Sequence, residues 1–265
     1  MVVVAVKNVA KNIKMKNKKI RTLIFDIETM PNLTRTWGKW EQNTIWNERH
    51  WYLWSFSYKW LGESKIYHCK LPDFPMYKKD KYNDLSLTSC LWELFDEADI
   101  IIAHNGNAFD LKKVRTLFVK HNLRPPEPYK QIDTKLVAKR YFNFDSNSLK
   151  DLAEFLGLDK KLETGGYELW KDCEAGVKSA WKTMEKYNNQ DVKVLEELYL
   201  TLLPYIDNHP NIALMKAEVE SCPNCGSSKL RRQGYAYTRA GIQQKLQCMS
   251  CFSWHKQPMK GGQVR

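Results

Sequence analysis

The sequence predicts an α/β fold, a mixed sheet flanked by helices, followed by a small second module at the C-terminus. Three early strand-like stretches precede a strand–helix–strand order and then a run of helices, which is the pattern of helices layered on a sheet. Two Cys-x2-Cys pairs near the end of the chain mark the second module. With 265 residues, 43% of them hydrophobic, the chain can bury one large core and a small one.

Apolar patterning gives the expected elements in order. The first strand covers about residues 21–28 and is ended by Pro31 and Asn32, whereas residues 33–50 show no clear period. Leu87, Leu91 and Leu94 have the spacing of one helix face. The other strands are expected at about 51–60, 65–69, 99–103 and 129–133. The helices are expected at about 85–98, 107–121, 134–142, 148–156, 174–186 and 187–204.

The domain organisation follows from composition. We expect a basic N-terminal arm at 1–20, the α/β domain at 21–204, a linker at 205–217 and the second module at 218–265. No apolar run approaches the ~20 residues of a membrane span, and the apolar start is too short for a signal peptide. The expected location is therefore the cytoplasm, with nucleoid association compatible, and no membrane partner.

The net charge of +12 is concentrated at the two ends. Residues 1–22 hold seven Lys or Arg and no acid, and residues 216–265 hold nine Lys or Arg and two acids. The remaining body therefore carries a charge of 12 − 7 − 7 = −2. A polyanion is the natural partner, nucleic acid first, although a basic tail without a partner is the alternative for the N-terminal run.

Two carboxylates stand two residues apart in the first strand. Side chains alternate along a strand, so Asp26 and Glu28 point to the same face. Adjacent like charges repel, which favours a divalent cation between them. An edge strand whose acids face water is the alternative.

Two more acids and a tyrosine follow. Asp110 comes after a buried strand, near the edge where α/β sheets place their ligands, but it also has capping-box spacing from Asn107. Tyr187 and Asp191 are four residues apart and share a helix face. A solvated Asp beside a half-buried Tyr is the alternative for that pair.

The ordered motifs Asp-x-Glu, Asn-x3-Phe-Asp and Tyr-x3-Asp resemble the exonuclease motifs of the DEDD superfamily, Tyr subtype. They are most similar to the proofreading domains of family B DNA polymerases, over roughly residues 21–204. The resemblance implies a ribonuclease H-like fold and removal of nucleotides from a 3′ end of DNA, with two Mg²⁺ or Mn²⁺ ions. The chain is too short to carry a polymerase body as well, so its physiological role stays open.

The resemblance also implies roles for individual residues. Asp26 would bridge the two metals, while Glu28 and Asp191 would complete the site of the attacking water. Asp110 would serve the second metal, and Tyr187 would orient the water. Asn105, Phe109 and Thr29 fall where the family contacts the terminal nucleotides, although Phe109 is equally compatible with the core.

The C-terminal cysteines have the spacing of a structural zinc site. The pairs Cys222/Cys225 and Cys248/Cys251 are separated by 22 residues, and four thiolates form a closed Zn²⁺ site with no catalytic position. The stretch resembles a zinc ribbon. We read the three scattered cysteines, Cys69, Cys90 and Cys173, as buried thiols.

The module interleaves basic and aromatic residues, which suits backbone contact and base stacking on a single strand. The candidate contacts are Arg231, Arg232, Arg239 and Lys245. The sequence thus favours a metal-dependent 3′→5′ exonuclease acting on DNA. The alternatives are a ribonuclease of the same chemistry, or a non-catalytic protein that binds nucleic acid or docks a partner such as a replication or recombination protein.

Overall fold

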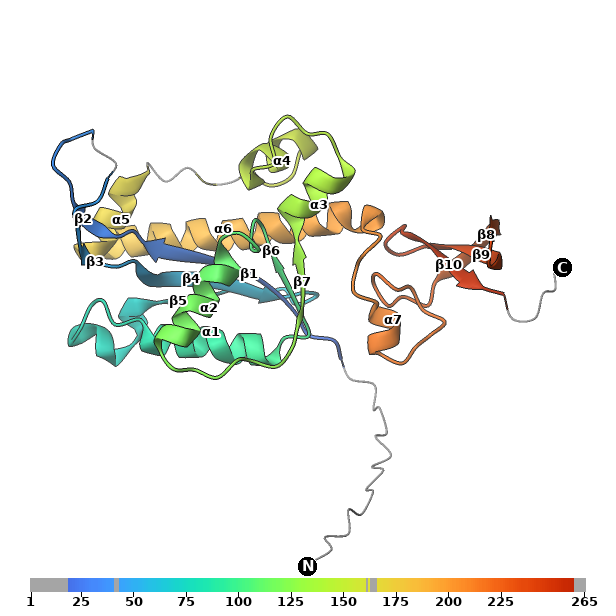
Figure 1. Ribbon diagram of the computed structural model, residues 1–265, viewed down its shortest axis with the longest axis horizontal. Coiled ribbons are helices and arrows are strands. Elements are labelled where there is room, and N and C mark those ends of the chain that lie inside the picture. The colour runs from blue at the N-terminus through green and yellow to red at the C-terminus, as the bar shows by residue number, and fades with distance from the viewer. Residues whose placement is uncertain (1–18, 41–42, 161, 163–165, 260–265) are drawn as a thin grey trace, which may run out of the picture.

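A five-stranded mixed sheet in the order β5-β4-β1-β6-β7 forms the centre of the molecule (Figure 1). The computed structural model describes residues 19–40, 43–160, 162 and 166–259, so the predicted N-terminal arm lies almost wholly outside them. β1 pairs antiparallel with β4 and parallel with β6, which confirms the predicted mixed sheet. The strands are β1 (Thr22–Met30), β4 (Tyr52–Trp60), β5 (Tyr67–Lys70), β6 (Ile100–Ala103) and β7 (Lys130–Asp133).

The central strand β1 is apolar on both faces because helices cover both sides of the sheet. Leu23, Phe25 and Ile27 enter one buried cluster, which includes residues of α1 and α2. Ile24 enters a second cluster with residues of α3, α4 and the C-terminal half of α6. Asp26 and Glu28 therefore continue the face of Ile24, where the sequence replaces apolar side chains with acids.

Six helices surround the sheet. They are α1 (Leu85–Glu97), α2 (Asp110–Lys120), α3 (Thr134–Tyr141), α4 (Leu149–Leu156), α5 (Tyr167–Glu174) and α6 (Lys178–Leu202). The expected helices at 174–186 and 187–204 form one 25-residue helix, α6, because no Gly or Pro lies between Lys178 and Leu202. Residues 174–177, which include Gly176, precede this helix. α6 packs against β1, β4 and β5 and is the long helix behind the sheet in Figure 1.

Short elements fill the connections. A two-stranded hairpin, β2 (Leu33–Arg35) with β3 (Trp46–Arg49), joins β1 to β4 and was not predicted. Among the described residues, 3-10 helices are present at Leu71–Asp73, Pro75–Lys78 and Leu203–Tyr205.

The C-terminal module is a three-stranded sheet in the order β10-β9-β8, beyond the C-terminal end of α6 in Figure 1. Its strands are β8 (Leu230–Thr238), β9 (Gly241–Cys248) and β10 (Trp254–Pro258). The stretch expected as a linker carries a short helix, α7 (Ile212–Met215), with Ile206 and Ile212 buried. Within the described part of the chain, no helix has the length and apolar character needed to cross a bilayer.

Candidate functional site

Three carboxylates meet where α6 packs against β1. Asp26 and Glu28 lie on β1 and Asp191 lies on α6, and one carboxylate oxygen from each falls within 4.8 Å of the others. Asp191 is only 2% exposed, so the alternative interpretation of this residue as a solvated surface acid is wrong. β1 is also the central strand of the sheet, which removes the alternative of an edge strand.

This donor set fits a small divalent cation. Mg²⁺ takes oxygen ligands at about 2.1 Å in octahedral geometry, which places neighbouring ligand oxygens about 3–4 Å apart. The three carboxylates approach that spacing while one of them is buried. Gathering three negative charges at a partly buried position is costly without a positive partner.

Asp110 lies beside this cluster and is not one of its three members. It is the first residue of α2, is 4% exposed, and receives a hydrogen bond from the Ile27 backbone, between Asp26 and Glu28. Burial raises the pKa of Asp110 to about 7, so a nearby cation would favour its carboxylate form. The capping-box alternative is wrong, because Phe109 is the N-cap of α2 and makes no side-chain cap.

Tyr187 lies one helical turn before Asp191 on α6, as the spacing predicts. It is partly buried, and its ring meets Trp170 of α5 edge-on, with 6.3 Å between ring centroids. The same helix therefore carries both a carboxylate of the cluster and a phenol next to it.

Asn188 is a site residue that sequence reasoning missed. It is fully buried, and its Nδ2 donates to Asp26 Oδ2 at 2.7 Å and to the Asp26 backbone oxygen at 3.3 Å. These bonds fix the carboxylate orientation of Asp26. The sequence signal that could have identified Asn188 is its position three residues before Asp191, on the same helix face.

A row of polar side chains crosses the sheet from Asp26. Ser57 on β4 pairs with Asp26, and His68 on β5 pairs with Ser57. Ser57 Oγ lies 2.9 Å from His68 Nδ1 and donates to Asn189 Oδ1 at 2.7 Å. Burial lowers the pKa of His68 to about 4, so the ring is neutral at pH 7. These bonds tie β4 to β5 and to α6.

The residues expected to contact terminal nucleotides lie on β1 and on the segment between β6 and α2. Thr29 follows Glu28 at a β-bulge. Asn105 has a φ of 64°, and its backbone N–H donates to Asp133, which also caps α3. Phe109 is 42% exposed, which argues against its alternative as a core residue.

The four module cysteines converge as the spacing predicts. Their sulfurs all lie within 4.8 Å of one another, with 3.6 Å between Cys222 and Cys251 and 3.6 Å between Cys225 and Cys248. Zn–S bonds of about 2.3 Å in a tetrahedron place the sulfurs about 3.8 Å apart, so the site fits zinc. The three other cysteines are free; Cys173 is buried, as expected, but Cys69 and Cys90 are only partly so.

The module's candidate contact residues lie on its strands and turn. Arg231, Arg232 and Arg239 are exposed, and Lys245 is partly buried. Aromatic rings accompany them, with Tyr237 77% exposed and Trp254 55% exposed.

Comparison with known proteins agrees with this architecture. The family model of the RNase H superfamily matches residues 62–203, more than half of the chain. This chain belongs to the RNase H superfamily. The matched region of this superfamily member contains Asp110, Tyr187 and Asp191 and begins after β1.

A solved structure shares the fold. The family B DNA polymerase from the hyperthermophilic archaeon Pyrobaculum calidifontis superposes with a TM-score of 0.52 and 16% sequence identity. The alignment covers 84% of this chain and 31% of the polymerase chain, so this protein spans about a third of its length. No curated protein sequence matches.

Proposed function

We propose that this protein is a metal-dependent 3′→5′ exonuclease that hydrolyses DNA at single-stranded ends. The observation that carries the proposal is the meeting of Asp26, Glu28 and Asp191, which lie in the order and spacing of the exonuclease motifs that the sequence resembles. The fold of the RNase H superfamily and the likeness to a DNA polymerase support it.

Each residue has a role in this proposal. Asp26, Glu28 and Asp191 would hold the catalytic ions, and Asp110 would serve the second of them. Bound Mg²⁺ or Mn²⁺ supplies an activated water and neutralises charge on the leaving oxygen. Tyr187 orients the water through its hydroxyl, and Asn188 keeps Asp26 in its binding orientation. The four cysteines hold one structural Zn²⁺, with no open position for chemistry.

End-labelled single strands test the proposal. We expect stepwise shortening from the 3′ end of DNA with Mg²⁺ or Mn²⁺ and none with EDTA, read at nucleotide resolution. Shortening of RNA in preference to DNA would make the protein a ribonuclease of the same chemistry. Binding without any cleavage would make it a nucleic-acid-binding or partner-docking protein.

We expect the Asn188→Leu protein to need about tenfold more metal for half-maximal cleavage. The substitution keeps the volume of the side chain but removes the donor to Asp26 Oδ2, and a hydrogen bond to a charged group contributes about 1.5–3 kcal/mol. Calorimetric titration with Mn²⁺ measures the same change without catalysis.

Gln190→Leu is the matched control. It removes an amide from the same helix at an exposed bond to the Lys160 carbonyl, away from the carboxylates. Equal Mn²⁺ affinity in the Asn188→Leu protein and in the unsubstituted protein would show that Asn188 does not position Asp26.

A further inference from the structure

A cleft lined by basic and aromatic side chains lies between α2 and the chain that enters β4. Its volume is about 470 Å³, and its lining belongs to the segment from Arg49 to Tyr52, to Tyr82 and to the last turns of α2. Lys120 and Arg49 line it together with the exposed His50. Among the described residues, no acidic side chain lines it.

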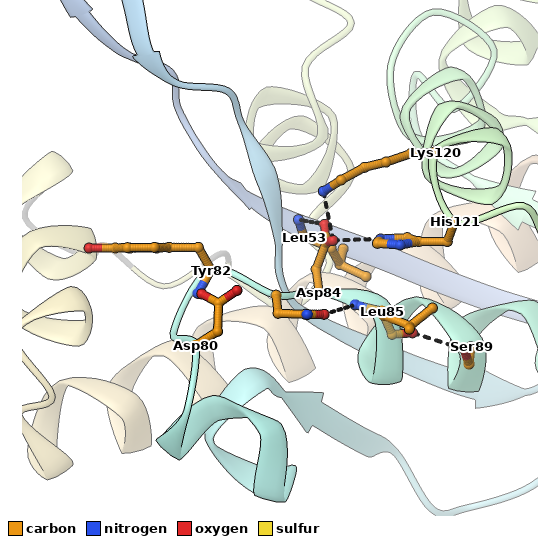
Figure 2. Close-up of polar contacts among 9 residues, drawn as sticks. Leu53, Asp80, Tyr82, Asp84, Leu85, Ser89, Lys120 and His121 are labelled. Atoms are coloured by element: carbon orange, nitrogen blue, oxygen red, sulfur yellow. Dashed lines mark hydrogen bonds and ion pairs between the residues drawn. The ribbon is translucent and has the colours of Figure 1, made fainter.

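Acidic side chains fix the two strong cations of this cleft. Lys120 Nζ lies 2.8 Å from Asp84, a fully buried carboxylate that also accepts from the Leu53 backbone and meets His121. Figure 2 shows Lys120 and His121 converging on Asp84, while Tyr82 extends away from it. The cation head is therefore held in place while the Lys120 side chain stays 46% exposed.

Arg49 is fixed in a similar way. Its Nη2 donates to Glu174 of α5 at 2.7 Å, and its guanidinium lies 4.2 Å from the ring centroid of Tyr82. Tyr82 is 45% exposed, so part of its ring stays open to an occupant. A planar cation over one face of a partly exposed aromatic ring suits a phosphate and a base in adjacent positions.

A third cation, Lys113, connects the cleft to the carboxylate site. Lys113 Nζ lies 3.9 Å from the ring centroid of Trp51, in the cleft wall, and 5.0 Å from the ring of Phe109. Phe109 directly precedes Asp110 at the start of α2. Asp110 and Lys120 are ten residues apart, so at 1.5 Å per residue α2 spans about 15 Å between the two sites.

The surface before Tyr82 adds positive charge. Lys78, Lys79 and Lys81 are all exposed, and Asp80 is the one acid between them. The sequence places the excess positive charge at the two ends of the chain, because the net charge of the body is close to zero. The folded body carries these lysines in the segment that leads into Tyr82, which lines the cleft.

We propose that this cleft binds an internal nucleotide of single-stranded nucleic acid whose 3′ end occupies the carboxylate site. The base stacks against Tyr82 and Trp51, and the adjoining phosphates meet Lys120 and Arg49. Stacking requires an unpaired base, so the cleft selects single strands over duplex. The orientation of the strand rests on the proposed exonuclease function, whereas binding in the cleft does not.

The test compares two double variants for binding to a long oligothymidylate in EDTA. Tyr82→Ala with Lys120→Gln removes the open ring and the charge, and the glutamine amide still offers Asp84 a donor. Tyr205→Ala with Lys139→Gln is the matched control, since both side chains are exposed and outside the cleft. We expect about a tenfold rise in Kd for the first and no change for the second.

Photocrosslinking locates the contact. With 5-iododeoxyuridine placed at each position from the 3′ end in turn, we expect an internal position to crosslink to Tyr82 or Trp51. Unchanged affinity in the cleft variant, or crosslinks to the zinc module alone, would overturn the proposal. Cleft binding without cleavage in Mg²⁺ would refute the exonuclease function and leave the cleft proposal standing.

Discussion

We expect the Asp191→Asn protein to lose at least about 10³-fold of its cleavage rate at saturating Mg²⁺. The substitution removes one charged ligand from the cluster that Asp191 forms with Asp26 and Glu28. A bound cation contributes several kcal/mol of transition-state charge stabilisation, and each 1.36 kcal/mol is about tenfold in rate. Single-turnover cleavage of an end-labelled strand measures the loss.

The same substitution should not unfold the protein. Asn is nearly isosteric with Asp, and removing one of three clustered negative charges relieves repulsion in the metal-free state. The Tm of the metal-free variant should therefore equal or exceed that of the parent. Asp172→Asn, at an exposed position of α5, is the matched control. A variant that kept near-parental cleavage would remove Asp191 from the site.

The sheet was predictable because its strands carry local signals. The β-branched stretches of β1 and β6 are bounded by polar residues, and the breaks at Pro31 and Gly157 coincide with element ends. The elements that the sequence does not predict correctly differ for physical reasons. In the hairpin of β2 and β3, the less exposed positions hold polar residues, whereas Leu33 and Trp46 are exposed, so no apolar alternation marks these strands in the sequence. α6 was divided because its polar stretch around Asn188 resembles a turn, whereas tertiary contacts bury Asn188.

In the candidate site, too, the local arrangement could be predicted from the sequence and the long-range contacts could not. Strand and helix periodicity place Asp26 beside Glu28 and Tyr187 beside Asp191, and both pairs share a face in the structure. That α6 brings Asp191 to Asp26 is a long-range contact, which only the motif resemblance anticipated. The bond from Asn188 to Asp26 joins residues 162 positions apart, and no local pattern encodes it.

The C-terminal module is attached to the end of α6 through the loop of its first cysteine pair. Asn224 Nδ2 donates to the backbone oxygens of Leu203 and Ile206, at 3.3 and 3.0 Å. The Ile212 backbone N–H donates to Pro223 O at 2.7 Å. Cys225 and Cys251 pack against the same apolar cluster as α6. Zinc would therefore stabilise both the module and the helix that carries Asp191.

We expect the Cys248→Ser protein to lose its zinc and to unfold the module, since so small a sheet has little core without the metal. Unfolding the module would remove its contacts with the end of α6, which contribute about 3 kcal/mol to the free energy of unfolding. The Tm of the remaining domain should therefore fall by about 5–10 °C. Cys90→Ser, at a free thiol of α1, should change neither zinc content nor Tm beyond a small packing effect. If about three of the module's eight Lys or Arg contact phosphates, the log–log salt slope of single-strand binding should weaken by about 2. An unchanged slope in the zinc-free protein would instead make the module a docking site for a protein partner.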